Sequence, residues 1–194
     1  MSAFPRWAVL SGVAGLVANV LLILFFAVSD PWTSGGALDW LGPANDAMVV
    51  VQFAALVPVA LAIRARRVAR TATAVGVGAM TAVVLLQLAL LADLLTFDVQ
   101  VWPEIACLAI TFAWILGVSR AGRDALPRAV VRLGTTVGVS YLAGAAVFAA
   151  GALLMPADSL ALYVVCGAGA VIGLVGWLGF PVWPLVVART GVEA

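Results

Sequence analysis

The sequence has no histidine, no lysine and only two cysteines. Without histidine there is no imidazole ligand for haem, zinc or copper, and no Ser-His or Cys-His pair for nucleophilic catalysis. Without lysine there is no Schiff base and no phosphate-binding lysine of a P-loop. Cys107 and Cys166 both lie in apolar runs, where a buried free thiol is more common than a disulfide. We therefore predict a protein that carries no cofactor and has no recognisable catalytic chemistry.

Charge is also scarce: 10% of the 194 residues are charged and 65% are hydrophobic. Soluble domains have roughly 25% charged and 45–50% apolar residues, so a water-soluble fold is excluded. A transmembrane helix needs about 20 apolar residues, and six runs approach or exceed that length. These runs are residues 7–28, 47–63, 71–95, 103–118, 130–155 and 159–188. We predict one all-α domain over residues 1–194, a polytopic bundle of six transmembrane helices arranged as three hairpins.

Two of the six runs have features of their own. The first run is preceded by Arg6 and ends at Ala27-Val28-Ser29, a small-residue sequence that could be a cleavage site. This is the order of regions in a signal peptide. The apolar stretch of this run is longer than the 7–15 residues of a typical signal peptide, which favours a retained helix. The last run is too long for one straight helix, and Pro181 and Pro184 interrupt it. Proline removes a backbone donor, so we expect a kink or a break near Gly179.

The charged residues predict the orientation of the chain. With six spans, every arginine falls on one side and most acidic residues fall on the other. The positive-inside rule then places both termini in the cytoplasm. The absence of lysine beside abundant alanine, glycine, valine and arginine is typical of GC-rich bacterial genomes, so we expect a bacterial inner membrane. The arginines between the second and third runs either attract anionic lipid or serve only as topogenic charge. These are Arg64, Arg66, Arg67 and Arg70.

Polar side chains within the runs give the candidate binding site. Asn19, Gln52 and Gln87 lie about 8–12 Å below the expected outer boundary, counting 1.5 Å per residue. They are either interhelical hydrogen-bonding groups, worth about 0.6 kcal/mol each, or the lining of an outward-facing polar pocket for a small ligand or cation. In the second case Asp93 and Glu104 lie at its mouth and attract cations.

The acidic residues at the outer turns have a simpler interpretation. An acid in the first turn of a helix interacts favourably with the unpaired backbone N–H groups there and with the positive end of the helix dipole. Asp46, Glu104 and Asp158 are therefore expected to cap the second, fourth and sixth helices. Asp93 and Asp98 instead fall at the end of the third helix, where the helix dipole disfavours an anion. Asp93 is either solvated at the interface or turned inward as a cation or proton site.

Aromatic residues and glycines complete the sequence pattern. Trp177 and Trp183 are expected to anchor the inner interface. The spacing of Gly134 with Gly138, and of Gly169 with Gly173, permits close helix approach. That approach occurs either within the chain or across a dimer face. A homo-oligomer or a membrane partner therefore remains open, and we expect no nucleic-acid partner.

Three short segments carry a resemblance. They are Leu10-Ser11-Gly12-Val13-Ala14-Gly15, Asp39-Trp40-Leu41-Gly42-Pro43 and Gly176-Trp177-Leu178-Gly179-Phe180-Pro181-Val182-Trp183-Pro184. In these segments the chain resembles uncharacterised bacterial six-helix integral membrane proteins of unknown function. The resemblance implies a multi-pass membrane protein and transfers no catalytic residue. The first functional hypothesis is a non-enzymatic protein, structural or accessory to a partner, and the alternative is a small transporter or ligand-binding protein.

Overall fold

The computed structural model describes residues 4–28, 36–65, 70–156 and 159–190, and all regular elements in these ranges are helices. Six stretches are long and apolar enough to cross a membrane, the sixth being α6 and α7 together. This confirms the all-helical class and the six potential spans. The helices are α1 (Phe4–Val28), α2 (Leu41–Ala65), α3 (Arg70–Leu91), α4 (Phe97–Ala121), α5 (Arg128–Leu154), α6 (Leu160–Gly179) and α7 (Val182–Arg189).

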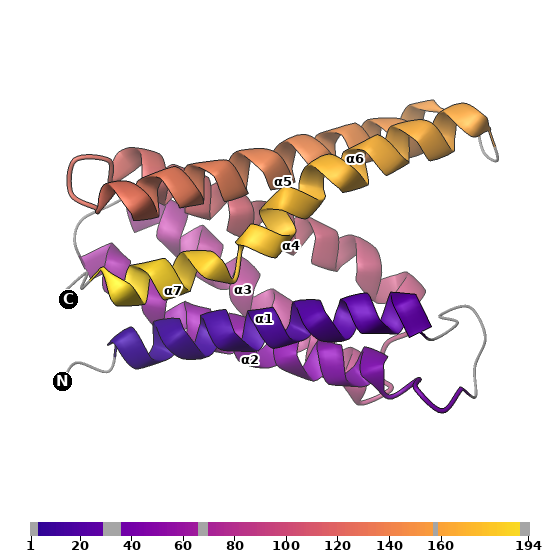
Figure 1. Cartoon of the computed structure of the whole chain (residues 1–194), viewed down its shortest axis with the longest axis horizontal. Coiled ribbons are helices and arrows are strands. Elements are labelled where there is room, and N and C mark those ends of the chain that lie inside the picture. The colour runs from indigo at the N-terminus through magenta and orange to yellow at the C-terminus, as the bar shows by residue number, and fades with distance from the viewer. Residues whose placement is uncertain (1–3, 29–35, 66–69, 157–158, 191–194) are drawn as a thin grey trace.

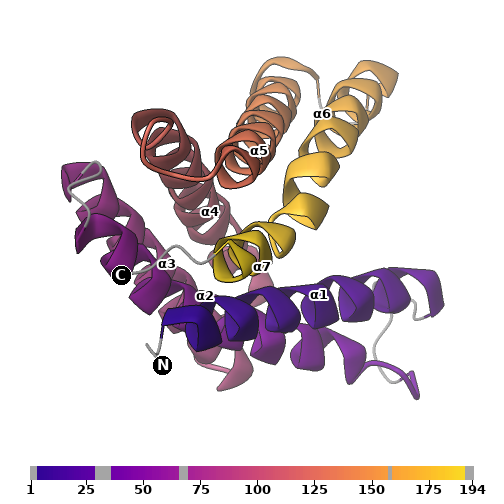
Figure 2. The same ribbon diagram turned by 60° about the vertical axis from the view of Figure 1, so that its left-hand side comes forward.

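The long helices run lengthwise through the molecule, and each packs against the next along the chain (Figure 1). α7 returns along α1 and also contacts α5, so the start of α1 and the end of α7 lie at the same end of the bundle (Figure 1). At the other end, α6 stands away from α1 and α2 and packs mainly on α5 (Figure 2). The bundle is therefore closed at one end and splayed at the other.

The break near Gly179 is confirmed. α6 ends at Gly179, and α7 begins at Val182 after the Phe180-Pro181 pair. Pro181 has no N–H to continue the helical hydrogen bonds, so the chain turns there. The new direction lays α7 along α1, where Leu185 contacts Gly12 and Pro181 contacts Gly15.

Two helices begin earlier than the apolar runs predicted. α2 starts at Leu41 and α4 at Phe97, and each has 25 residues. The prediction that Asp46 and Glu104 cap these helices is therefore wrong, since neither lies in a first turn. Asp98 does lie in the first turn of α4, where the dipole favours an anion, and not at the end of α3 as expected. Asp158 lies outside the described residues.

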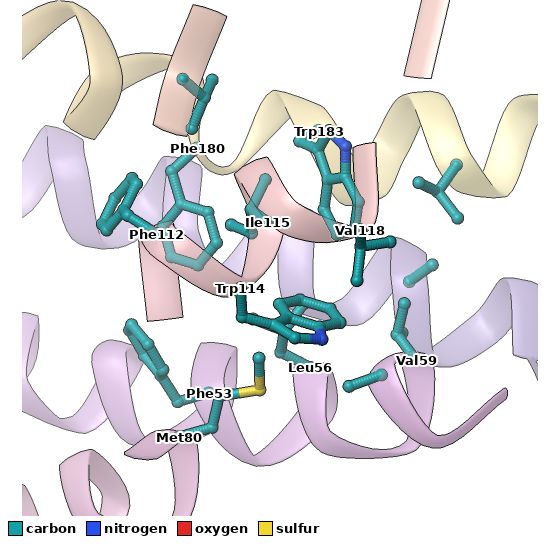
Figure 3. Packing of buried hydrophobic residues seen from close by; sticks show 14 of the residues in the cluster. Phe53, Leu56, Val59, Met80, Phe112, Trp114, Ile115, Val118, Phe180 and Trp183 are labelled. Atoms are coloured by element: carbon teal, nitrogen blue, oxygen red, sulfur yellow. The ribbon is translucent and has the colours of Figure 1, made fainter. Parts of the chain in front are cut away.

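The closed end is filled by large apolar side chains from several helices (Figure 3). Trp183 of α7 is 0% exposed, so its prediction as an interface anchor is wrong. The break at Pro181 turns α7 into the bundle, and Trp183 Nε1 donates to the carbonyl of Val130, 3.2 Å away. Its ring meets that of Trp114 edge-on, with the centroids 5.8 Å apart. Two further rings, those of Phe112 and Tyr141, stack with centroids 3.8 Å apart.

Arginines mark the closed end, which we call the basic end. The described arginines that lie at helix ends there are Arg6, Arg70, Arg120, Arg128 and Arg189 (Figure 1). The splayed end, which we call the acidic end, carries the half-buried Asp39 and the exposed Asp93 and Asp98. Arg66, Arg67 and the side chain of Arg64 lie outside the described residues, so the predicted lipid contact there stays a prediction.

The four glycines of the predicted close-approach motifs pack within the chain. A Cβ at Gly134 would meet Ser119 and Trp183, and one at Gly138 would meet Leu116. A Cβ at Gly169 would meet the backbone of Gly144 and Phe148, while Gly173 faces the backbone of Gly144. These motifs therefore bring α5 close to α4, α6 and α7. This is close approach within the chain, the first of the two interpretations given above, and not across a dimer face.

Asp93 ends α3 in an unfavourable backbone conformation. Its φ is +55°, and the next residue, Leu94, donates its N–H to the carbonyl of Ala89 at 2.8 Å. This is the left-handed position at a helix C-terminus that glycine prefers. An anion there also opposes the helix dipole. Asp93 is exposed, so it is solvated at the end of the helix and not turned inward.

Replacing Asp93 by glycine is expected to stabilise the protein by about 0.5–1 kcal/mol, because glycine adopts positive φ without a Cβ penalty. The measurement is the free energy of unfolding by SDS in mixed micelles, followed by pulse proteolysis. The matched control is Asp98→Gly. It removes a favourable anion from the first turn of α4, so it is expected to destabilise. Equal losses in both variants would contradict the assignment of Asp93 to this turn.

Candidate functional site

The candidate site centres on Glu104, two turns into α4. Its carboxylate accepts a hydrogen bond from Gln87 Nε2 of α3 at 2.7 Å, and its other oxygen accepts one from Gln100 Nε2. Gln100 precedes Glu104 by one helical turn, so both side chains lie on the same face of α4. Both glutamines are buried, with Gln100 1% and Gln87 5% exposed. Each oxygen of the Glu104 carboxylate is therefore held by one buried amide.

The start of α2 adds a second pair of polar residues. Asn45 is buried, and its Nδ2 donates to the Asp46 carboxylate at 3.2 Å. The Asp46 charge lies within electrostatic reach of Glu104. We call the set Gln87, Gln100, Glu104, Asn45 and Asp46 the Glu104 cluster. It joins three helices, α2, α3 and α4, at the acidic end of the bundle.

The three amides of the Glu104 cluster share one orientation. Each donates from its nitrogen to a carboxylate, as the hydrogen bonds of Gln87, Gln100 and Asn45 show. Each also leaves its carbonyl oxygen buried without a hydrogen-bond partner. Buried polar atoms are nearly always paired, because an unpaired one costs about 1–3 kcal/mol. The cluster thus has more acceptors than donors.

The cluster lies below the helix ends and within the expected hydrocarbon layer. With 1.5 Å per residue, Glu104 is about 10 Å along α4 from Phe97, and Gln87 is about 6 Å along α3 from Leu91. Towards the basic end, the cluster meets residues of the packed interior. Cys107 and Tyr141 both lie within electrostatic reach of the Glu104 carboxylate.

The structure brings together only part of the predicted site. Gln87 and Glu104 are in direct contact. Gln52 instead packs over Gly15 of α1, and its Nε2 is buried without a hydrogen-bond partner. Asn19 is buried on α1, one turn after Gly15.

Asp93 does not join the buried group, since it is exposed at the end of α3. At that position it contributes surface charge at the acidic end, with no contact to the Glu104 carboxylate among its described hydrogen bonds.

Gln100 and Asn45 belong to the Glu104 cluster but are not among the predicted site residues. Both lie outside the predicted apolar runs, in segments that combine proline, acids and amides. The helical spacing of Gln100 and Glu104 was the available signal. Four residues apart on a helix, they share a face, and this follows once α4 is known to begin at Phe97.

A separate cavity of about 340 Å³ lies between the splayed α5–α6 pair and the rest of the bundle. Leu22 of α1, Trp102 of α4, Phe148 of α5 and Leu174 of α6 are among its lining residues, which are almost entirely apolar. None of the predicted amides lines it. This cavity suits hydrocarbon and does not correspond to the predicted polar pocket.

No family model matches the chain, and no curated protein or solved structure is significantly similar to it. Within the described residues, no group of three or more His, Cys, Asp or Glu side chains is placed to hold a metal ion. The groups of the Glu104 cluster that could bind a ligand are therefore its two carboxylates and three amides.

Proposed function

We propose that this chain is a non-enzymatic, multi-pass protein of a bacterial inner membrane that binds a small ligand from the outer side at the Glu104 cluster. The observation that carries the proposal is the pair of buried, unpartnered amide oxygens of Gln87 and Gln100, whose nitrogens hold Glu104; Asn45 shows the same arrangement beside Asp46. If the amides only joined helices, their oxygens would also be paired, because an unpaired buried oxygen weakens such a joint. In a binding site, the amide oxygens stay unpaired within the protein because they bind the ligand.

The proposed topology follows from the two ends of the bundle. The basic end faces the cytoplasm by the positive-inside rule, which places both termini inside and makes three hairpins with outer turns. The acidic end then faces outward, and the exposed Asp93 and Asp98 raise the local concentration of cations at the entrance. The resemblance to bacterial six-helix membrane proteins agrees with this placement and adds no site.

A structural or accessory role is the second candidate, and the packing of the basic end favours it. Phe53, Phe112 and Trp183 are fully buried there and fill the space between the helices. A ligand at the Glu104 cluster therefore has no described polar route onward to the basic end. The first candidate is accordingly a binding protein open to one side.

The native Cys107 provides a test of outward access, because it follows Glu104 by one turn of α4. In a Cys166→Ala background, Cys107 is the single thiol. We expect a small, membrane-impermeant cationic methanethiosulfonate to modify it from the outside of right-side-out vesicles. We expect an anionic reagent of similar size to react about tenfold more slowly, because exposed acids surround the entrance. Mass spectrometry of the purified protein measures the modified fraction.

The matched control is Cys107→Ala with Cys166 retained. Cys166 packs between α5 and α6 with its Sγ 3.6 Å from the carbonyl oxygen of Phe148, away from the Glu104 cluster. It reports labelling that does not pass through the proposed entrance. If Cys107 stays unmodified from outside, or reacts only in inverted vesicles, the proposed function is wrong and the accessory role is left.

A further inference from the structure

We propose that the ligand of the Glu104 cluster is a hard metal cation, Na⁺ or Ca²⁺, bound through oxygen atoms. This inference rests on the proposed function and names the ligand class of that site. Gln87 and Gln100 are both more than nine-tenths buried, are aimed at Glu104, and keep an unpartnered oxygen each. Asn45 repeats the pattern beside Asp46.

The orientation of the amides indicates the sign of the ligand's charge. Each amide nitrogen already donates one hydrogen bond to a carboxylate, and the amide atoms left without any partner are oxygens. An anion would meet carboxylates and carbonyl oxygens and would be repelled. A neutral donor would satisfy an oxygen but would leave two carboxylates without a countercharge. A cation satisfies the oxygens and compensates the carboxylates together.

Among the described residues, no arginine is placed to supply such a cation. The described arginines at helix ends lie at the basic end, at the far end of the bundle from the Glu104 cluster (Figure 1). The one described ion pair joins Arg123 and Asp124, both exposed in the turn between α4 and α5. A buried carboxylate is costly in hydrocarbon unless it is paired. Glu104 and Asp46 are half-buried, so each is neutralised either by a proton or by a cation from the surrounding solution, and a metal titration distinguishes the two.

The atom types at the site restrict the choice of metal. The Glu104 cluster offers carboxylate and amide oxygens, which are the ligands of hard cations such as Ca²⁺. Zinc and copper favour imidazole and thiolate, and the chain has no histidine. Mg²⁺ keeps several waters in an octahedral shell, which fits poorly among residues as buried as Gln87 and Gln100. Na⁺ and Ca²⁺ are left, and they share the same oxygen chemistry.

The experiment measures the thermal unfolding of the complete chain in lipid nanodiscs at constant ionic strength. NaCl and CaCl₂ are titrated separately against choline chloride. We expect one of the two metals to raise Tm saturably, by about 5 °C at concentrations far above Kd. MgCl₂ is the size control for Ca²⁺, and KCl is the size control for Na⁺. Each is expected to give less than half of the shift.

Three variants assign the shift to the Glu104 cluster. Glu104→Gln keeps the shape of the side chain and removes its charge, so the metal-dependent shift is expected to disappear. Gln100→Met keeps the length and removes the oxygen, so the concentration needed for half the shift is expected to rise at least tenfold. Asp124→Asn removes an exposed acid at the basic end, away from the Glu104 cluster, and is expected to keep the full shift.

Equal Tm values in choline, Na⁺ and Ca²⁺ would overturn the cation inference, and so would a shift that persists in Glu104→Gln. Both results leave the proposed function standing if Cys107 is labelled from outside. A metal-dependent shift without outside labelling would support a cation at Glu104 and overturn the outward-facing site. The two proposals therefore fail through different measurements.

Discussion

Trp183→Ala is expected to destabilise the protein by about 3–5 kcal/mol, the usual cost of removing a fully buried tryptophan. Trp183 is 0% exposed and lies where α7 meets α1, α4 and α5 (Figure 3). Its removal leaves a cavity between Trp114 and Gly134, which it contacts on two sides. It also leaves the carbonyl of Val130 without its indole donor. The measurement is the free energy of unfolding in SDS mixed micelles.

Two control variants separate packing from the effects of losing any tryptophan. Trp102→Ala removes a ring that is 59% exposed, so its expected cost is below about 1 kcal/mol. Trp183→Phe keeps most of the volume and loses the hydrogen bond to Val130. We expect it to cost about 1–2 kcal/mol. A Trp183→Ala protein within 1 kcal/mol of the wild type would contradict the placement of α7 in the core.

Trp183 also shows where reading the sequence reached its limit. The run of apolar residues and the position of Pro181 correctly predicted six spans and a break after Gly179. The direction of α7 after the break depends on which helix it packs against. Gly12 and Gly15 create the space for α7 on α1, near the opposite end of the sequence from Pro181. A tryptophan near an expected interface could not be recognised as a core residue without this tertiary contact.

The candidate site was predictable to a similar degree. Of the predicted site residues, Gln87 and Glu104 are in contact, and their role as a binding site stays a prediction. Asn19 and Gln52 are buried as expected, but Gln52 packs on α1 and not on the Glu104 carboxylate. Depth along a helix can be counted from its ends, but the face depends on the rotation of each helix. These membrane-spanning helices carry apolar residues on all faces, so hydrophobic periodicity gives little information on which face points into the bundle.

The error at the start of α4 had the larger consequence for the site. Residues 97–102 fall outside the predicted fourth run, because Asp98, Gln100 and Pro103 lower the apolar content there. In the structure the polar side chains divide between two surroundings: Asp98 is exposed in the first turn, and Gln100 is buried against Glu104. Hydropathy averages over both faces of a helix, so it cannot distinguish a solvated turn from a helix with one buried polar face.

The second large effect is expected at Gly144, where α5 and α6 are in backbone contact. A Cβ at this position would meet the backbone nitrogen of Gly173 and the carbonyl oxygen of Gly169. Backbone atoms cannot move aside as a flexible side chain can, so Gly144→Ala must push the two helices apart. We expect a loss of about 2–3 kcal/mol, in the range measured for overpacked cores. The lost contacts include the close approach through which small residues stabilise helix pairs in membranes.

The same helix pair provides the controls for Gly144→Ala. A Cβ at Gly173 would lie 3.7 Å from the Cα of Gly144, which is ordinary van der Waals contact, so Gly173→Ala is expected to be nearly neutral. A Cβ at Gly167 would have no neighbour within 4 Å. Gly167→Ala is therefore expected to be neutral or to stabilise by up to about 1 kcal/mol, because alanine loses less backbone entropy. Unfolding in SDS mixed micelles ranks the three variants, and equal losses in all of them would mean that helix propensity, and not the α5–α6 contact, governs these positions.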